Sequence, residues 1–487
     1  MNARPRNRKA EKVRKAQMIR LVLAAGVVTL TATTANECAA ATVGWTGARV
    51  VAALQTRRLS LDGATIKGDI DFRRFDAVEH PFSCRNCVIE GRILADDVVF
   101  DATLDLSGAK ISAPVLVRRA TFRGPVLFGP TSGPSSRSSS FARGADFSFT
   151  RFDDLTTFVQ ASFASSADFT TARFRAASVF AGATFEHDAV FDRAIFDGGT
   201  DFRGSTFNGS TTFSAAQFDD RADFSDATFA GRADFGDTRF RNDGTFLGTL
   251  FTYGGGKTYG VTFGGAISER DLVFDLAQFS GGGIFRQTVA GRALSFDGAD
   301  MASTRKLFVF DRASAKGITM DVDDALAVVA PGDRRRVLRL IEAGAKASGD
   351  LGVANDARFS LEVLKSRDEP WWRRIPNIVL YRLVAGYFVR PFHPLATLFV
   401  LAGLVALTRA ARKRSAPSGL VRRVWIRLSA FGRESLDALA LVGRRADGNG
   451  SGGRRVEAFT YRVLVLCALI GLGNSNPTLR EMFDALI

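Results

Sequence analysis

Phenylalanine recurs between Phe141 and Phe251 at steps that alternate between six and five residues without a break. A mean step of about 5.5 residues fits neither the period of about 3.6 of an α-helix nor the alternation of 2 in a strand. A solenoid explains the spacing, because each short side of a four-sided coil then turns one phenylalanine inward. The positions are 141, 147, 152, 158, 163, 169, 174, 180, 185, 191, 196, 202, 207, 213, 218, 224, 229, 235, 240, 246 and 251.

A small residue often stands two places before these phenylalanines. The examples are Ala145, Ala167, Ala172, Ala183, Ala194, Ser205, Ala216, Ala222, Ala227 and Ala233. The repeating unit is therefore ADFxxAxFxxx, with two large and two small inward positions, while Asp, Arg, Thr and Gly face water at the corners. Four sides give about 22 residues per coil, and we expect the coils to stack at about 4.8 Å, the spacing of hydrogen-bonded strands.

The same spacing continues on both sides of the phenylalanine block with other occupants. Upstream it passes through Phe128, Phe122, Val117, Ile111, Leu106, Phe100, Ala95, Ile89 and Cys84, and downstream through Phe263, Phe274, Phe279, Phe285, Ala290, Phe296, Met301 and Leu307. The segment GPTSGPSSRSSS at 129–140 interrupts it and is typical of a surface loop. We predict a solenoid over 58–320, with about a dozen coils and a length of about 50–60 Å.

These A-D-F-x-x and A-x-F-x-x units resemble the pentapeptide-repeat family, in its phenylalanine-rich variant with alternating five- and six-residue units. The resemblance covers a little over half of the chain. It implies a mainly β fold, a right-handed quadrilateral parallel β-helix. The remaining regions, with an exported basic tail and C-terminal apolar segments, resemble actinobacterial pentapeptide-repeat membrane proteins.

Both ends of a solenoid expose strand edges and need a cover. Residues 41–57 form the expected N-terminal capping segment, with a short helix over 46–57. Residues 321–376 form the expected helical capping region, because Val337, Leu338, Ile341, Val353, Ala357, Leu361 and Leu364 follow helical spacing. We expect two helices joined near 349–352, followed by Trp371 and Trp372, which suit a membrane interface.

Residues 1–40 have the order of a secretory signal: a basic stretch, a short apolar stretch and a zone of small residues. A cleaved signal peptide and an uncleaved N-terminal anchor both fit this order. Either would place the residues that follow outside the cytoplasm.

Residues 377–487 form the expected membrane region. We predict one spanning helix over about 388–408, preceded by an interfacial segment, and a weaker apolar segment over 458–473 that contains Arg462. The loop 409–455 between them carries twelve Lys and Arg against three acidic residues, which predicts a cytoplasmic location. One or two transmembrane helices would thus anchor the protein in the cell membrane, with its repeat domain extracytoplasmic.

The net charge of +15 is concentrated beside the apolar segments. Residues 1–20 carry eight Lys and Arg against one Glu, whereas 141–251 carry ten Arg against sixteen Asp and Glu. We therefore interpret the basicity as membrane topology and expect no nucleic-acid partner.

Cys84 and Cys87 form a CxxC pair that lacks the second half of a zinc site. Because Cys84 falls on an inward position, we favour buried apolar cysteines. The alternative outside the cytoplasm is a disulfide, for which Cys38 is a candidate partner.

No catalytic constellation is evident. His80, His187 and His393 are far apart, and none lies near a nucleophile in a recognisable motif. VAGYFVRP at 384–391 lacks the Thr-Val-Gly-Tyr-Gly run of a potassium-channel filter. We predict no catalytic, cofactor-binding or metal-binding residues, no cofactor and no enzymatic activity.

Aspartates that precede inward phenylalanines could align into an acidic face, as in relatives that protect DNA gyrase by imitating a duplex. They are Asp146, Asp168, Asp201, Asp223 and Asp234. We favour a solvated face with Arg173, Arg203, Arg221 and Arg239 interleaved, since an exported rod cannot meet gyrase.

The sequence therefore predicts a non-enzymatic, membrane-tethered scaffold at the cell envelope, which binds a protein partner of unknown identity. Two alternatives stay open: a sensory or small-pore membrane protein with the solenoid as its sensor domain, and an acidic nucleic-acid mimic, which export disfavours. The sequence does not fix the oligomeric state.

Overall fold

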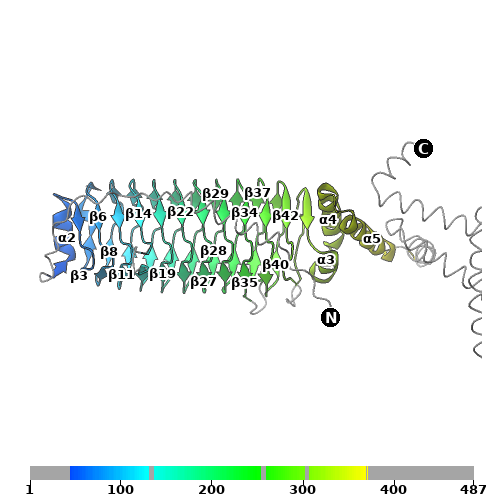
Figure 1. Ribbon diagram of the computed structural model, residues 1–487, viewed down its shortest axis with the longest axis horizontal. Coiled ribbons are helices and arrows are strands. Elements are labelled where there is room, and N and C mark those ends of the chain that lie inside the picture. The colour runs from blue at the N-terminus through cyan, green and yellow to red at the C-terminus, as the bar shows by residue number, and fades with distance from the viewer. Residues whose placement is uncertain (1–43, 131–136, 254–258, 302–306, 369, 371–487) are drawn as a thin grey trace, which may run out of the picture. The chain divides into compact units, whose positions relative to one another are not determined.

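The computed structural model describes residues 44–130, 137–253, 259–301, 307–368 and 370 (Figure 1). The predicted signal or anchor at 1–40, Cys38, Trp371, Trp372, the span at 388–408, the loop at 409–455 and the segment at 458–473 lie outside these residues. None of the described helices is both long and apolar enough to cross a membrane.

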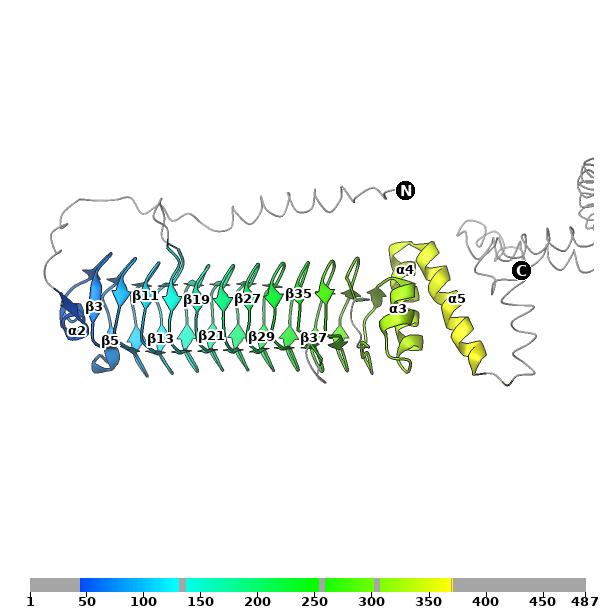
Figure 2. The same ribbon diagram turned by 90° about the horizontal axis from the view of Figure 1, so that it is seen from below.

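Very short strands build four parallel sheets that run side by side along the solenoid (Figures 1 and 2). Within the described residues, sheet A contains β1 (Trp45–Thr46), β3 (Thr65–Lys67), β7 (Val88–Ile89), β11 (Lys110–Ile111), β15 (Ser140–Phe141), β19 (Ser162–Phe163), β23 (Thr184–Phe185), β27 (Thr206–Phe207), β31 (Thr228–Phe229), β35 (Leu250–Phe251) and β39 (Gln278–Phe279). Sheet B contains β2 (Leu59–Ser60), β6 (Phe82–Ser83), β10 (Leu104–Asp105), β14 (Val126–Leu127), β18 (Thr156–Thr157), β22 (Ser178–Val179), β26 (Thr200–Asp201), β30 (Ala222–Asp223), β34 (Gly244–Thr245), β38 (Leu272–Val273), β42 (Ala293–Ser295) and β43 (Gly317–Thr319).

The other two sheets complete each coil, and the chain visits the four in the order B, A, C, D. Sheet C contains β4 (Ile70–Asp71), β8 (Ile93–Leu94), β12 (Val115–Leu116), β16 (Ala145–Asp146), β20 (Ala167–Asp168), β24 (Ala189–Val190), β28 (Thr211–Thr212), β32 (Ala233–Asp234), β36 (Val261–Thr262) and β40 (Gly283–Ile284). Sheet D contains β5 (Ala77–Val78), β9 (Val99–Phe100), β13 (Thr121–Phe122), β17 (Arg151–Phe152), β21 (Arg173–Phe174), β25 (Ile195–Phe196), β29 (Gln217–Phe218), β33 (Arg239–Phe240), β37 (Ile267–Ser268) and β41 (Val289–Ala290).

The register between neighbouring strands confirms the predicted coil of 22 residues. Phe163 lies opposite Phe185, and Phe185 lies opposite Phe207 in the next coil. Ile111 lies opposite Phe141, because the insertion at 129–140 lengthens that one coil without changing the side that follows it. The predicted parallel β-solenoid is therefore confirmed.

Stacked phenylalanine rings fill the interior of the central coils. Along the axis, the rings of Phe163 and Phe185 lie 4.7 Å apart and 1° from parallel. Across the coil, Phe169 meets Phe180 edge-on, with ring centroids 5.6 Å apart at 87°. Both are favoured arrangements of aromatic pairs, and every phenylalanine of the 141–251 series is buried, as predicted.

Serine and threonine can occupy the small inward positions because their hydroxyls donate hydrogen bonds to backbone carbonyls. Ser205 Oγ donates to the carbonyl of Phe180 at 2.8 Å, and the Thr238 and Thr249 hydroxyls donate to phenylalanine carbonyls in the same way. A buried hydroxyl with a partner costs little. Among the described residues, Thr211 Oγ1 on β28 is the one buried side-chain oxygen without a hydrogen-bond partner.

The corners between sheets B and A and between sheets C and D regularly turn through a residue in the left-handed region. Glycine meets this need at Gly204 (φ +63°), but Phe149, Thr171 and Asp237 adopt the same conformation at φ 58°, 57° and 55°. Side chains with a Cβ pay for this conformation, β-branched ones most. Since Gly, Phe, Thr and Asp all occur at this position despite that cost, the residue type is less restricted at the corners than at the inward positions.

Helices cover both ends of the described solenoid. At the N-terminal end, α2 (Gly47–Leu54) buries Val50, Val51 and Leu54, in the region where a short capping helix is expected. The single-turn helix η1 (Phe72–Arg74) lies at the corner between β4 and β5 of the first coil. At the other end, the chain passes from β43 through α3 (Val322–Val328) to α4 (Arg334–Ser348) and α5 (Leu351–Arg367).

The helix pair α4 and α5 matches the predicted spacing. Gly349, at φ +80°, ends α4, and the Asp350 carboxylate accepts the Val353 N–H to begin α5. Sequence analysis did not single out α3, whose three buried residues are too few to form a periodic pattern.

The prediction that Leu307 points inward is wrong. The side chain of Leu307 is 39% exposed, and its neighbour Phe308 is buried instead. Phe308 donates its N–H to Val328 at 2.8 Å and bridges Val329, so this last coil follows the cap and not the repeat. A shift of one residue in a strand turns each side chain to the opposite face.

Candidate functional site

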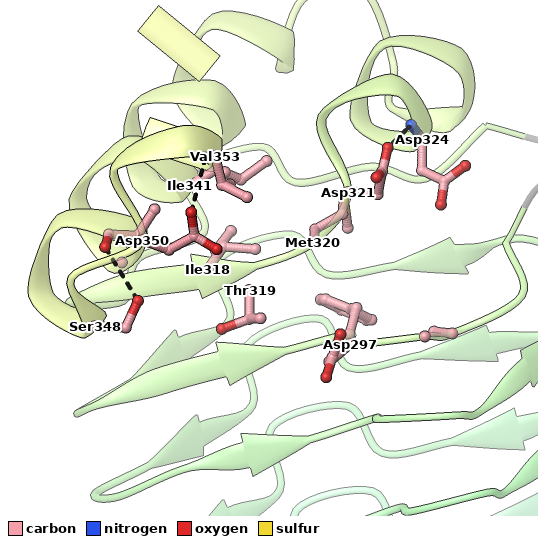
Figure 3. Close-up of a pocket in the computed structure, with 15 residues that line it drawn as sticks. Asp297, Ile318, Thr319, Met320, Asp321, Asp324, Ile341, Ser348, Asp350 and Val353 are labelled. Atoms are coloured by element: carbon pink, nitrogen blue, oxygen red, sulfur yellow. Dashed lines mark hydrogen bonds between the residues drawn. The ribbon is translucent and has the colours of Figure 1, made fainter. Parts of the chain in front are cut away.

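A cavity of about 400 Å³ lies between the last coil and the C-terminal cap (Figure 3). Phe296, Ile318, Met320, Ile341 and Val353 form its apolar wall. Four carboxylates also line it: Asp297, Asp321, Asp324 and Asp350. The cavity thus combines an apolar wall with excess negative charge.

Two of these carboxylates already have a structural role. Asp321 accepts the N–H groups of Asp323 and Asp324 at 2.7 and 3.3 Å, and so caps α3, and Asp350 caps α5 (Figure 3). Burial, followed by the nearby Asp321 carboxylate, raises the pKa of Asp324 above its ordinary value. Within the described part of the chain, His, Cys, Asp and Glu side chains form no group of three or more that could hold a metal ion.

The predicted apolar cysteine pair is a disulfide. Cys84 and Cys87 are both buried, as expected for inward positions, but their sulfurs are bonded and their Cα atoms lie 5.4 Å apart. The interpretation as two free buried cysteines is therefore wrong. The alternative of a disulfide is right, but the bond joins Cys84 to Cys87 and does not involve Cys38. The bridge occupies a large and a small inward position at one corner between sheets B and A, where later coils place a ring and an alanine.

The aspartates expected to share an acidic face lie on two different sheets. Asp146, Asp168 and Asp234 lie on sheet C, and Asp201 and Asp223 lie on sheet B. Three of them form ion pairs with arginines. The side chain of Arg203 lies 2.6 Å from Asp201, that of Arg221 lies 3.2 Å from Asp223, and that of Arg232 lies 3.7 Å from Asp234. The interpretation with interleaved arginines is confirmed for Arg203 and Arg221, whereas Arg173 and Arg239 lie on sheet D.

The two described histidines are not brought together. His187 is exposed at the corner between sheets A and C, and His80 precedes strand β6 of sheet B in an early coil. His393 and the VAGYFVRP segment lie outside the described residues.

Sheet D carries charges of alternating sign along the solenoid. The residues directly after its inward positions alternate in sign over five successive coils: Asp101, Arg123, Asp153, Arg175 and Asp197. Arg123 binds Asp101 at 2.7 Å, and Arg175 lies 3.5 Å from Asp153. A ladder of ion pairs therefore follows this face along the axis.

Sheet A differs from sheet D at the equivalent outward positions. Its successive strands present Ser140, Ser162, Thr184, Thr206 and Thr228, all partly buried. The solenoid thus has one hydroxyl-rich face and one charged face on the same backbone.

Sequence analysis missed two exposed apolar residues at the corners on either side of β17. Phe149 is 56% exposed and Leu155 is 39% exposed. Their signal in the sequence is that each is a large apolar residue outside the six-five spacing.

Comparison with known families supports the repeat. Residues 191–239 match the family model described as pentapeptide repeats (9 copies). No curated protein and no solved structure gives a significant match to the chain.

Proposed function

Because this chain is a pentapeptide-repeat protein, and such solenoids generally serve structural or interaction roles, we propose that it is a non-enzymatic scaffold at the cell envelope. In this proposal the solenoid lies outside the cytoplasm and is tethered to the membrane by the C-terminal region. Its surface binds a protein partner, and nucleic acid is not a ligand.

The packed interior of the solenoid carries the proposal. Rings stack along the axis from coil to coil, as Phe180 and Phe202 do at 4.7 Å, so the central coils leave no lumen for a substrate. A partner that binds the central coils must then use their outer faces. Regular parallel pairing makes these faces rigid, which suits a protein that presents groups at fixed spacing.

The buried disulfide supports the proposed location. Structural disulfides persist in oxidising compartments and are rare in the bacterial cytoplasm. Cys84 and Cys87 lie in the interior of an early coil, where reduction would leave two thiols in place of a covalent link. The excess of Lys and Arg in 409–455 supports the same topology.

The ion-paired surface argues against a nucleic-acid mimic. A duplex-like surface needs a continuous excess of negative charge, whereas Arg203, Arg221 and Arg232 neutralise the carboxylates beside them.

Cysteine labelling in spheroplasts tests the location. The Thr206→Cys side chain would point outward from sheet A, and we expect a membrane-impermeant maleimide to label it in intact spheroplasts. The matched variant Ser429→Cys lies in the basic loop and should be labelled only after permeabilisation. The unsubstituted protein reports the background from native cysteines, and the reverse labelling pattern would contradict the proposal.

A further inference from the structure

Sheet B ends beside the cavity with a backbone donor that has no acceptor. In this sheet the large inward residue of each coil donates its N–H to the following coil, as Phe296 does to Thr319 at 2.7 Å. Met320 takes the equivalent place one coil later, because Ser295 lies opposite Thr319 in the register of β42 and β43. No further strand of sheet B follows β43, and no described residue accepts the Met320 N–H.

This donor is buried at the wall of the cavity. Met320 is 5% exposed and lines the cavity together with Ile318 on β43 and Ile341 on α4 (Figure 3). The direction of the ladder turns its N–H toward the cap, on the side where the cavity lies. A buried backbone N–H without an acceptor is rare in folded proteins, because it has lost its hydrogen bond to water. The edge of sheet B therefore offers a donor to an incoming acceptor.

The cavity also carries negative charge that its own residues do not neutralise. Its four carboxylates belong to Asp297, Asp321, Asp324 and Asp350, and none of the residues that line it is Lys, Arg or His. Arginines neutralise Asp201 and Asp223 further along the same sheet. Burial is the largest cause of the raised pKa of Asp324, and the remaining causes are all neighbouring carboxylates. A ligand that suits this cavity is therefore positively charged.

We propose that an extended basic segment of a partner protein binds in this cavity as a further strand of sheet B. A carbonyl of the segment accepts the Met320 N–H, and its Lys or Arg side chains bind the carboxylates. In strand addition, main-chain hydrogen bonds give affinity and alternate side chains give specificity. This inference rests on the proposed scaffold function and names the class of its partner.

A peptide satisfies both features of the cavity, whereas a small cation satisfies one. An ammonium group binds carboxylates but has no acceptor for the Met320 N–H. Asp321 and Asp350 already accept N–H groups at the caps of α3 and α5, so we expect the cationic side chains to bind mainly Asp297 and Asp324. The volume of about 400 Å³ suits a short segment, since ligand sites commonly measure about 300–1,000 Å³.

The test combines fluorescence anisotropy and hydrogen exchange on the purified full-length protein in a non-ionic detergent. We expect a labelled KVKVK peptide to bind saturably and the charge-reversed peptide EVEVE not to bind. Exchange of the Met320 amide should slow when KVKVK binds and stay unchanged with spermidine, a cation without a carbonyl. Saturable binding that leaves Met320 exchange unchanged would overturn the inference, as would absence of KVKVK binding.

A pair of double variants separates the cavity from the rest of the acidic surface. Asp297→Asn/Asp324→Asn should raise the Kd for KVKVK about tenfold. Because neither carboxylate caps a helix, circular dichroism of this variant should match that of the parent protein. The matched control Asp226→Asn/Asp237→Asn removes two exposed carboxylates at corners of the central coils and should leave the Kd unchanged.

Equal losses of affinity in the two double variants would contradict a site in the cavity. Because the assay uses purified protein, its failure would leave the cellular topology test unaffected.

Discussion

The early coils at 59–128 and the central coils at 139–251 share one backbone but differ in their interiors. In the early coils, sheets A, B and C turn mainly Ile, Leu, Val and a disulfide inward, and Ile66, Ile89 and Ile111 follow one another on sheet A. In the central coils, phenylalanine takes over the large positions of all four sheets. The column continues across the change, since Ile111 lies opposite Phe141.

This difference shows that the spacing of the buried apolar positions specifies the coil, and that an aromatic ring at those positions is not required. Any apolar side chain of adequate size at the inward point supports the four-sided turn, and stacked rings add aromatic contacts to it. The two regions should therefore respond differently to substitution, oxidation state and pH. Because solenoids need not unfold in a single step, these responses are best read coil by coil.

The largest effect is expected from truncating a central ring. Phe191 stacks on Phe169 at 4.9 Å and on Phe213 at 4.7 Å, so Phe191→Ala should leave a cavity and cost about 3–5 kcal/mol. In the early coils, Ile111→Val should cost only about 0.5–1.5 kcal/mol. Native-state hydrogen exchange of the neighbouring strands measures both, and equal costs would remove the distinction between the two interiors.

Removal of the Cys84–Cys87 disulfide should affect the early coils and leave the central coils unchanged. Cys84→Ser/Cys87→Ser should lower local stability by about 2 kcal/mol, as loop-closure entropy predicts for so short a loop. Faster amide exchange should appear around β6 and β7, with β23 and β27 unchanged. Uniform loss of protection along the solenoid would show that the bridge is not a local feature.

Acid should separate the two ends of the solenoid. Hydrogen bonds from Arg118 and Arg92 hold the pKa of Asp96 and of Asp69 below the ordinary value. These pairs stabilise the early coils above the unfolded pKa of about 3.9, and that stability is lost as the pH falls through the lower folded values. Burial raises the pKa of Asp275, so its ionised form opposes folding at neutral pH and protonation relieves this.

The predicted outcome is that protection factors, which are corrected for the intrinsic exchange rate at each pH, fall between pH 5 and pH 3 around β4 and β8 before they fall around β38. Asp275→Asn should stabilise the region of β38 at neutral pH and reduce its pH dependence. Earlier acid loss around β38 would contradict these pKa directions.

The smallest effect concerns one hydroxyl in the central interior. Thr211 Oγ1 has no partner, so Thr211→Val should raise stability by about 1 kcal/mol while keeping the side-chain shape. Thr238 donates to the Phe213 carbonyl at 2.8 Å, and Thr238→Val should give no such gain. Thermal denaturation of the two variants provides the comparison, which fails if both shift the midpoint equally.

The repeat could be predicted because every coil demands the same inward residues. Phe163 and Phe207 report the same environment, and many such positions make the period unmistakable. Leu307 lies where the cap, through Phe308 and Val329, replaces the repeat as the packing partner, so periodicity no longer predicts its direction.

The surface was less predictable because it depends on which side of the coil each residue occupies. Asp146 and Asp201 both directly precede an inward phenylalanine but lie on different sheets. Phe149 is hard to interpret from sequence alone, because an apolar residue among many others reveals its exposure only once the inward positions are assigned. The pairing of Cys84 with Cys87 likewise needed the geometry of the corner.

The 22-residue register is the central claim, and engineered disulfides test it most directly. Thr184, Thr206 and Thr228 point outward on successive strands of sheet A. Adjacent strands lie about 4.8 Å apart and permit a disulfide, whereas strands two coils apart lie beyond the limit of about 7 Å between Cα atoms. Under mild oxidation, peptide mass spectrometry should find an intramolecular bond in Thr184→Cys/Thr206→Cys and none in Thr184→Cys/Thr228→Cys. A bond in the second pair without one in the first would contradict the solenoid described here.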